Sequence, residues 1–358
     1  IEWMLEAGME IKIDDMGSIY GWLEGSDQNA LPICIGSHCD TQPNGGKYDG
    51  LYGVMAGLEA ICTLKDAGVI TKSPLVLIDW TNEEGARFVP PMIASGVISG
   101  KFQQEWAYEI KDREGASYKQ ELIRIGYLGE KGNRLTQAKF YFEPHIEQGP
   151  VLDEEGFDIG IVTGALGIVG LDVHIKGEAN HAGSTPMSHR KDALIAAAEV
   201  MLKLREHVIG YGDPAVITMG VIAVAPGTKN IIPEEAYFSI DLRYDDDERL
   251  SLLENEVIGL IQSICSEFGV QAEIHRYWRA DPAHFDHRII KAVGKASDEC
   301  GLRSREIVSG AGHDAVFINE IIPTGMLFVP SINGVSHSPL EDTSWEHLVK
   351  GTEVLVKV

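Results

Sequence analysis

The chain has 358 residues, 44% of them apolar, which is enough for one large domain or two ordinary ones. Its formal net charge of −24 argues against a nucleic-acid partner, because binding phosphates requires a basic surface. No apolar stretch reaches the length of a membrane span, and the first residues show no secretory signal pattern. Five cysteines without a Cys-x-x-Cys pair do not form a disulfide framework. We therefore expect a cytoplasmic protein without a membrane partner.

The first part of the chain alternates apolar strands with helices. Residues 31–37 and 75–80 form short apolar runs typical of buried strands. Between them, residues 54–67 have apolar side chains at helical spacing. Residues 101–139 are charged and aromatic, and we expect surface helices and loops there. This β-α-β rhythm predicts a mostly parallel sheet covered by helices.

The middle of the chain follows a different pattern, because apolar and polar residues alternate in two of its segments, as in half-buried strands. The predicted elements are strand, helix, strand, strand, helix and strand, at 169–175, 192–206, 215–224, 238–244, 246–268 and 270–277. The order β-α-β-β-α-β is that of the ferredoxin-like unit.

The α/β rhythm returns after about residue 281, with strands at 306–309 and 326–329 and a C-terminal helix from about residue 343. The sequence thus predicts an α/β protein whose catalytic domain, built on a central mixed, mostly parallel sheet, is interrupted by an inserted ferredoxin-like lid domain. The predicted boundaries are 1–166 and 282–358 for the catalytic domain and 167–281 for the lid.

Histidine and carboxylate side chains gather where we expect strands to end. The candidates for metal ligands are His38, Asp49, Glu84, His145 and His337. In open α/β sheets, sites form at the carboxyl ends of the strands, so these loops can converge. Imidazole and carboxylate are ligands that zinc takes, and a bridging carboxylate can hold two ions together. The sequence therefore predicts a dinuclear metal site.

Four acidic residues have separate expected roles in this site. Asp49 is the candidate bridge between the ions. Asp40, two residues after His38, would accept the second ring N–H of that histidine and fix its tautomer. Adjacent residues point in different directions, so Glu84 can bind metal while Glu83 faces the water as general base.

Each motif alone is weak, because His-x-Asp is more often a polar turn and Glu-Glu a solvated surface. Their combination, each after a predicted strand, is much more specific. Glycines at 45, 46, 50, 53 and 57 invite a phosphate-loop interpretation, but no Gly-Lys-Ser/Thr or dinucleotide fingerprint is present. Tight turns and close helix packing explain them better.

Over essentially its whole length the chain resembles the aminoacylase-type dinuclear zinc hydrolases. Within them it is similar to the group of N-carbamoyl-L-amino-acid hydrolase, β-ureidopropionase and allantoate amidohydrolase. The motifs that carry the resemblance are Gly36-Ser37-His38-x-Asp40, Asn44-Gly45-Gly46-Lys47-Tyr48-Asp49-Gly50, Glu83-Glu84-Gly85-x-Arg87-Phe88, His145-Ile146-Glu147-Gln148-Gly149, Asn180-His181-Ala182-Gly183-Ser184-Thr185-Pro186-Met187, Ser309-Gly310-Ala311-Gly312-His313-Asp314 and Ser336-His337-Ser338-Pro339.

The resemblance implies two divalent ions per subunit, most simply zinc, although manganese, cobalt or nickel suit the same ligands. It implies His38 and His145 on one ion, Glu84 and His337 on the other, and Asp49 between them. It also implies a homodimer formed through the lid domain. Peptidase relatives usually carry a carboxylate at the position of His145, so the histidine favours an amidase.

The resemblance further assigns substrate contacts. Asn230 and Arg243 would hold the substrate carboxylate, and Gln148 would contact the ureido end. His181 would stabilise the developing oxyanion, from the same chain or from the partner subunit, and His313 would add a polar contact. From the residues themselves, Arg243 lies on the polar face of an alternating strand, where a bidentate carboxylate contact and a surface salt bridge are both open.

The predicted activity is cleavage of the carbamoyl (ureido) C–N bond of N-carbamoyl-amino acids to amino acid, ammonia and carbon dioxide. Allantoate, ureidoglycolate or a dipeptide are alternative substrates of the same fold. An alternative of another class is a binding protein with an inactive site, against which the intact set of ligands and Glu83 argues.

Overall fold

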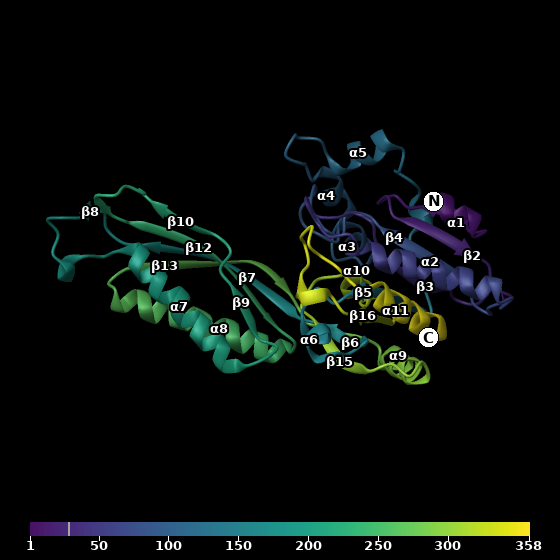
Figure 1. Ribbon diagram of the computed structural model, residues 1–358. Helices are drawn as coiled ribbons and strands as arrows, with labels where there is room; N and C mark the ends of the chain where they lie inside the picture. Colours follow the sequence, from purple (N-terminus) through teal and green to yellow (C-terminus); the bar gives the residue numbers. More distant parts are fainter. Residues whose placement is uncertain (28) are drawn as a thin grey trace. The chain divides into compact units, whose positions relative to one another are not determined.

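The computed structural model describes residues 1–27 and 29–358, and this part of the chain divides into two compact units. Unit 1 comprises Ile1–Ala165 and His284–Val358, and unit 2 comprises Leu166–Ala283. The chain therefore leaves unit 1, completes unit 2 and returns (Figure 1). Among the described residues, none of the helices combines the length and the apolar character that crossing a membrane requires.

Unit 1 is built on a mixed sheet of nine strands within the described residues. In sheet order these are β1 (Glu10–Ile13), β2 (Ile19–Leu23), β4 (Leu75–Trp80), β3 (Ile33–His38), β5 (Phe140–Ile146), β16 (Thr324–Val329), β6 (Ile159–Ala165) and β14 (Ala283–His284), with β15 (Ser304–Ser309) paired to β6. The central strands β4, β3, β5 and β16 run parallel to one another. Antiparallel pairings flank them, between β2 and β4 and between β16 and β6.

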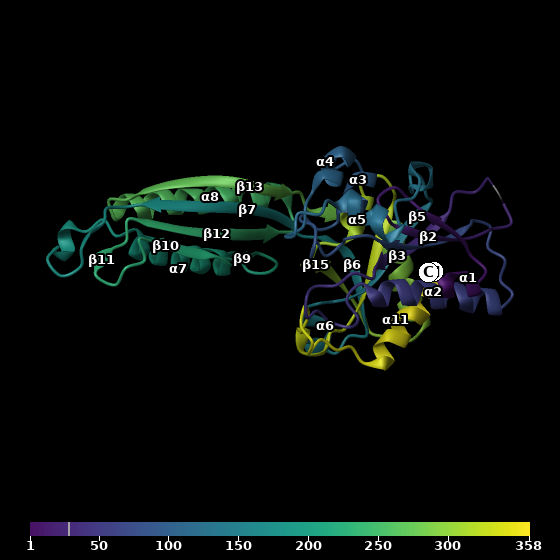
Figure 2. The same ribbon diagram turned by 90° about the horizontal axis from the view of Figure 1, so that it is seen from above.

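Helices cover both faces of this sheet. They are α1 (Glu2–Glu6), α2 (Leu51–Asp66), α3 (Ile93–Ile98), α4 (Gln104–Glu109), α5 (Tyr118–Ile125), α6 (Val151–Glu155), α9 (His287–Glu299), α10 (Asp314–Ile318) and α11 (Trp345–Lys357), with single turns η1 (Lys131–Asn133) and η3 (Ile332–Gly334). In Figure 2, α2 and α11 lie on one side of the sheet and α3 and α4 on the other. This layering is the α/β arrangement that the sequence predicted.

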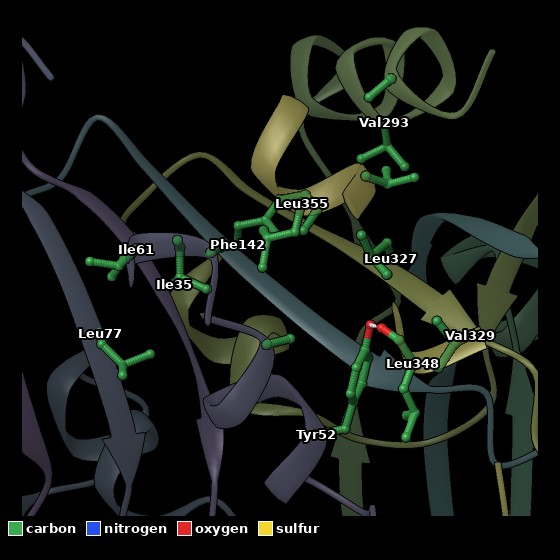
Figure 3. Packing of buried hydrophobic residues seen from close by; sticks show 14 of the residues in the cluster. Ile35, Tyr52, Ile61, Leu77, Phe142, Val293, Leu327, Val329, Leu348 and Leu355 are labelled. Carbon is green, nitrogen blue, oxygen red and sulfur yellow. Dashed lines mark hydrogen bonds between the residues drawn. The ribbon is translucent and has the colours of Figure 1, made fainter. Parts of the chain in front are cut away.

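The main core of unit 1 lies between the sheet and the layer of α2, α9 and α11. Phe142 and Leu327 project from β5 and β16 toward Ile61 of α2, Val293 of α9 and Leu355 of α11 (Figure 3). Strand residues alternate between faces, so the neighbours of Phe142 along β5 point to the opposite side of the sheet. The core thus fixes the strands whose ends carry the polar residues described below.

Unit 2 is an antiparallel sheet with two long helices. Its elements are β7 (Gly167–Lys176), β8 (Asn180–His181), η2 (Met187–His189), α7 (Ala193–Tyr211), β9 (Val216–Thr218), β10 (Ile222–Ala225), β11 (Ile231–Ile232), β12 (Glu235–Tyr244), α8 (Asp247–Glu267) and β13 (Gln271–Ala280). The order in the sheet is β10-β12-β7-β13, with β9 also on β12. Asp192 and Asp246 cap α7 and α8 through their side chains, which explains where both helices begin. A separate core joins the two helices to one face of the sheet.

One predicted strand is wrong in detail, because residues 215–224 form two strands rather than one. β9 pairs with Asp241–Arg243 and β10 with Glu235–Phe238, so residues 219–221 face two residues of β12. This extra residue is a β-bulge, and Gly220 lies within it. The prediction also missed the N-terminal hairpin of β1 and β2, and strands β5 and β6.

Candidate metal centre

Polar side chains converge where the parallel strands of unit 1 end. His38 is the last residue of β3, and Glu83 and Glu84 follow β4. His145 is the next-to-last residue of β5, and the loop after β16 carries His337. We expected each to follow a strand, whereas His38 and His145 lie on the strand ends themselves. Since these strands are parallel and adjacent, their carboxyl ends share one edge of the sheet.

Asp49 lies at the centre of this edge, just before α2, and it is shared by two groups of potential ligands. The first group is His38, Asp49 and His145, all buried. Oδ1 of Asp49 lies 3.2 Å from Nε2 of His145 and 3.9 Å from Nε2 of His38. Three potential ligand atoms thus face one another within 4.8 Å, a spacing at which a single cation can contact all of them.

The second group is Asp49, Glu84 and His337. Nε2 of His337 lies 3.2 Å from Oδ2 of Asp49 and 3.5 Å from Oε2 of Glu84. Asp49 therefore presents one carboxylate oxygen to each group. A carboxylate placed in this way can bridge two cations.

Hydrogen bonds leave the ligand nitrogens of two histidines free of protons. Nδ1 of His38 donates to the main-chain oxygen of Asp40 at 2.9 Å, and Nδ1 of His145 donates to that of Ile146 at 2.8 Å. The main-chain N–H of Gly50 donates to Nε2 of His145 at 3.1 Å. A neutral imidazole with its Nδ1 proton bound elsewhere offers the Nε2 lone pair to a metal ion.

The electrostatics of the cluster also fit cations. Burial and the neighbouring His145 lower the pKa of His38 to about 4, so its imidazole is neutral and able to bind a metal. Burial opposes the ionisation of Asp49, but the neighbouring imidazoles of His145 and His337 outweigh it and hold the pKa of Asp49 below its usual value. Oε1 of Glu84 is buried and lacks a hydrogen-bond partner among the described residues. A bound cation would satisfy this oxygen.

Glu83 lies beside both groups but belongs to neither of them. Its side chain is buried, and Oε2 lies 3.5 Å from Nε2 of His38. Burial, reinforced by the charges of Asp314, Glu84 and other carboxylates, raises the pKa of Glu83 well above its usual value. A buried carboxylate with a raised pKa next to a metal site can accept a proton and return it.

Comparison with known proteins supports these observations. Residues 34–358 match peptidase family M20/M25/M40. The chain belongs to this family. It is 40% identical to the N-carbamoyl-L-amino-acid amidohydrolase of Rhizobium meliloti and 38% identical to the allantoate amidohydrolase of Bacillus subtilis. The alignments cover 99% and 98% of this chain and 85% and 86% of the two relatives. A hydantoinase/carbamoylase family amidase from Burkholderia multivorans has a similar structure, with a TM-score of 0.94 at 38% identity over 99% of this chain and 86% of the other.

The M20 family is metal-dependent, and the five ligand candidates meet in this chain as the resemblance implied. Asp40 differs from our expectation. It binds His38 through its main-chain oxygen, while its carboxylate accepts the main-chain N–H groups of Glu83 and Glu84 at 3.2 Å each. The carboxylate lies 3.7 Å from the His38 ring and instead fixes the loop that carries the two glutamates. Local main-chain geometry, which spacing does not reveal, decides this.

Two further predicted residues of unit 1 adjoin the centre. Nε2 of Gln148 donates to Oδ2 of Asp49 at 3.0 Å and to Oγ of Ser336 at 3.1 Å. His313 is buried, its ring centre 4.5 Å from that of His145, and its Nε2 is hydrogen-bonded to Ser309 at 2.9 Å. Gln148 thus contacts the centre directly, while His313 packs against one of its ligands.

The remaining predicted residues belong to unit 2. β8 pairs with β11, so His181 lies opposite Ile231, and the N–H of Ala182 bonds to the oxygen of Asn230. His181 and Asn230 therefore lie close together. Nδ1 of His181 accepts the main-chain N–H groups of Gly183 and Ser184, which leaves Nε2–H as an exposed donor. Arg243 lies elsewhere, near the end of β12, where it forms a bidentate pair with Asp241.

Sequence reasoning missed a set of buried acids that support the centre. Glu143 of β5 accepts hydrogen bonds from Ser37 and from the N–H of Ala315, and Asp314 accepts one from Ser95. Glu341 contacts the loops of Asp49 and His337. Glu143 could have been found from its alternation with His145 along one strand, but Glu341 carries no such signal.

Proposed function

We propose that this protein is a metal-dependent amidohydrolase that cleaves the carbamoyl C–N bond of N-carbamoyl-amino acids, releasing amino acid, ammonia and carbon dioxide. The observation that carries the proposal is the pair of ligand groups that share Asp49, with the buried Glu83 beside them. The similarity to carbamoyl-amino-acid and allantoate amidohydrolases supports this class of substrate.

Two divalent ions, zinc in the simplest case, would be held by His38, His145 and Asp49 and by Asp49, Glu84 and His337, and would acidify a water and polarise the substrate carbonyl. Glu83 accepts the proton of the attacking water and returns it to the leaving amine. The C–N bond to the amino acid breaks, and the carbamic acid product decomposes to ammonia and carbon dioxide.

The chain offers hydrogen-bond partners for the ureido group of the substrate and for its carbonyl oxygen. Gln148 is hydrogen-bonded to Asp49 and so lies where the ureido group would approach the ions. His181 has an exposed Nε2–H, a donor suited to the oxygen that gains negative charge as the water attacks. We assign Gln148 to the ureido end and His181 to the oxyanion, with His313 as a supporting contact behind His145.

The clamp for the substrate carboxylate requires two copies of the chain. Asn230 lies next to His181, beyond the end of β12 that begins at Glu235. Arg243 is eight residues after Glu235 along this strand, a distance of about 26 Å at 3.3 Å per residue. One carboxylate cannot contact both groups of the same chain. We therefore assign Arg243 to one subunit and Asn230 and His181 to its partner, within a homodimer formed through this ferredoxin-like lid.

Unit 2 has a surface suited to such a dimer. Along α7, three apolar side chains that are more than half exposed recur every seven residues: Ile195, Leu202 and Ile209. The adjacent sheet ends at the edge strand β10, where Ile222 is exposed as well. An apolar helix stripe and an open strand edge on one unit are features that a second copy can cover.

An assay on four substrates tests the function, with ammonia release measured for the three ureido compounds and amino-acid release for dipeptides. We expect turnover of N-carbamoyl-α-amino acids above that of N-carbamoyl-β-alanine, allantoate and dipeptides, and loss of turnover on chelation. Preference for allantoate would keep the class and change the substrate. Absence of ammonia release from every ureido compound by metal-loaded protein would refute the proposal.

Mixing two inactive variants tests the shared site. If His181 acts from the partner, a heterodimer of Glu83→Gln and His181→Ala contains one site with both defects and one intact site, so activity reappears. If His181 acts within its own chain, each site keeps one defect and the mixture stays inactive. Leu202→Glu places a charge on the proposed dimer surface and leaves the residues of the site unchanged. We expect it to produce monomers with bound metal but without activity.

A further inference from the structure

Glu341 is a buried carboxylate that joins two loops of the candidate centre. It is 2% exposed. Its Oε1 accepts the main-chain N–H groups of Tyr48 and Asp49, at 3.1 and 3.2 Å. Its Oε2 accepts the hydroxyl of Ser336 at 2.8 Å. One side chain thus ties the loop of the bridging carboxylate to the loop of His337.

The chain is shaped around this carboxylate. A Cβ atom at Gly46 would overlap the carboxyl group of Glu341, so the close approach of the two loops requires glycine there. Among the described residues Glu341 accepts three hydrogen bonds, two of them from the main chain. The orientation of its carboxylate is therefore set by the fold.

This orientation determines the direction of the next hydrogen bonds. Ser336 has one hydroxyl proton, and Glu341 can only accept, so the proton points to Glu341. The lone pairs of Ser336 then accept Nε2–H of Gln148 at 3.1 Å. The second acceptor of Nε2 is Oδ2 of Asp49, at 3.0 Å. Both bonds use the nitrogen branch of the amide, so Oε1 of Gln148 points away from Ser336 and Asp49.

We propose that Glu341 and Ser336 are positioning residues that fix the amide of Gln148 with its oxygen toward the substrate, and that this selects the terminal NH₂ of a ureido group. The proposal rests on the proposed function, because it assumes that Gln148 faces the scissile carbonyl. A ureido NH₂ donates hydrogen bonds and finds its acceptor in Oε1. A flipped amide would present NH₂ to NH₂, which removes the bond and adds repulsion.

Ser336 matters most when the centre is loaded. Oδ2 of Asp49 also faces His337 and Glu84, so a cation in this group competes with Gln148 for the same oxygen. Ser336 is then the acceptor that still distinguishes the two faces of the amide. An N-formyl substrate has the same carbonyl and no NH₂, so its hydrolysis does not depend on this orientation.

The experiment compares kcat/KM for an N-carbamoyl and an N-formyl derivative of one amino acid. We expect Ser336→Ala to lower the carbamoyl-to-formyl ratio about tenfold, the effect of one lost hydrogen bond, with the metal content unchanged. Ser336→Thr retains the hydroxyl and is expected to keep the wild-type ratio. Glu341→Gln is nearly isosteric. Its Oε1 must still accept the N–H groups of Tyr48 and Asp49, so its NH₂ faces Ser336. The hydroxyl proton of Ser336 then points toward Gln148. We therefore expect the carbamoyl-to-formyl ratio to fall in this variant as well.

Binding provides a readout besides turnover. In the Glu83→Gln background, calorimetry should show that Ser336→Ala weakens the N-carbamoyl ligand about tenfold and leaves the N-formyl ligand unchanged. Equal losses on both ligands, or an unchanged ratio in Ser336→Ala and Glu341→Gln, would overturn the proposal. A wild-type protein that hydrolyses neither substrate is a separate result, since it refutes the proposed function itself.

Discussion

Replacing Glu83 by Gln separates proton transfer from metal binding. The amide has the size of the carboxylate, but it cannot accept a proton from water. Glu83 is in neither ligand group, and Oε2 is 3.5 Å from the nearest ligand nitrogen, on His38. We therefore expect Glu83→Gln to keep the wild-type metal content while its chemistry slows.

The expected magnitude follows from this isolated role. A positioned general base contributes about 10²- to 10⁴-fold, so kcat should fall by this factor, or by about 3–5 kcal/mol in barrier. The variant should also be more stable without metal. Glu83 is buried among carboxylates that raise its pKa, and a neutral amide removes the unfavourable charge. Activity and metal-free stability thus change in opposite directions.

Glu84→Gln is the matched control, because the same substitution one residue later affects a ligand. Glu84 lies with Asp49 and His337, so we expect weaker binding of one ion and activity that rises again with added metal. Elemental analysis, ammonia-release kinetics and thermal unfolding of the metal-free protein measure the three quantities. A kcat within tenfold of wild type for Glu83→Gln, or loss of its metal, would refute the assignment.

Two further predictions concern the framework of unit 1. Gly46→Ala should lower the melting temperature and the metal content together, because the added methyl group displaces Glu341. Such overpacking costs about 1–3 kcal/mol of folding free energy. An unchanged melting temperature would contradict this prediction. Burial raises the pKa of Asp14 from 3.8 to about 6, so its protonated form favours the native state and this contribution is lost as pH rises through 6. Denaturant unfolding measures the free energy of unfolding at pH 5 and at pH 8. Between these pH values the wild type should lose about 1.4 kcal/mol more of it than Asp14→Asn does. Equal decreases in variant and wild type would contradict the assignment.

The position of the candidate metal ligands could be predicted because the sheet itself brings them together. Buried apolar strands such as 75–80 can be recognised in the sequence, and the carboxyl ends of neighbouring parallel strands lie at one edge of the sheet. Residues at the ends of these strands or a few residues beyond them, such as His38 and Glu84, are then neighbours in space. The pairing of candidate ligands into two groups came from the resemblance, and the structure places the ligand atoms of each group within 4.8 Å of one another.

The supporting contacts could not be predicted, because they depend on loop conformation. Asp40 contacts His38 through its main chain, and Glu341 lies 292 residues from the N–H of Asp49 that it binds. Gln148 and His337 both have positive φ angles, which no spacing rule indicates for these residue types. The separation of Arg243, near the end of β12, from Asn230, beyond the start of this strand, likewise required the register of the sheet.

The buried carboxylates make metal binding part of the stability of unit 1. Burial and the charge of Glu143 raise the pKa of Asp314 well above its usual value, and its Oδ2 has no hydrogen-bond partner among the described residues. An acid whose pKa is raised on folding favours the native state below its unfolded pKa, and this stability is lost as pH rises. Nearby cations offset the repulsion among such charges. We therefore expect chelation to lower the melting temperature more at pH 8 than at pH 5, and Asp314→Asn to reduce this difference. The same decrease in melting temperature at both pH values would show that these acids do not couple metal binding to the stability of unit 1.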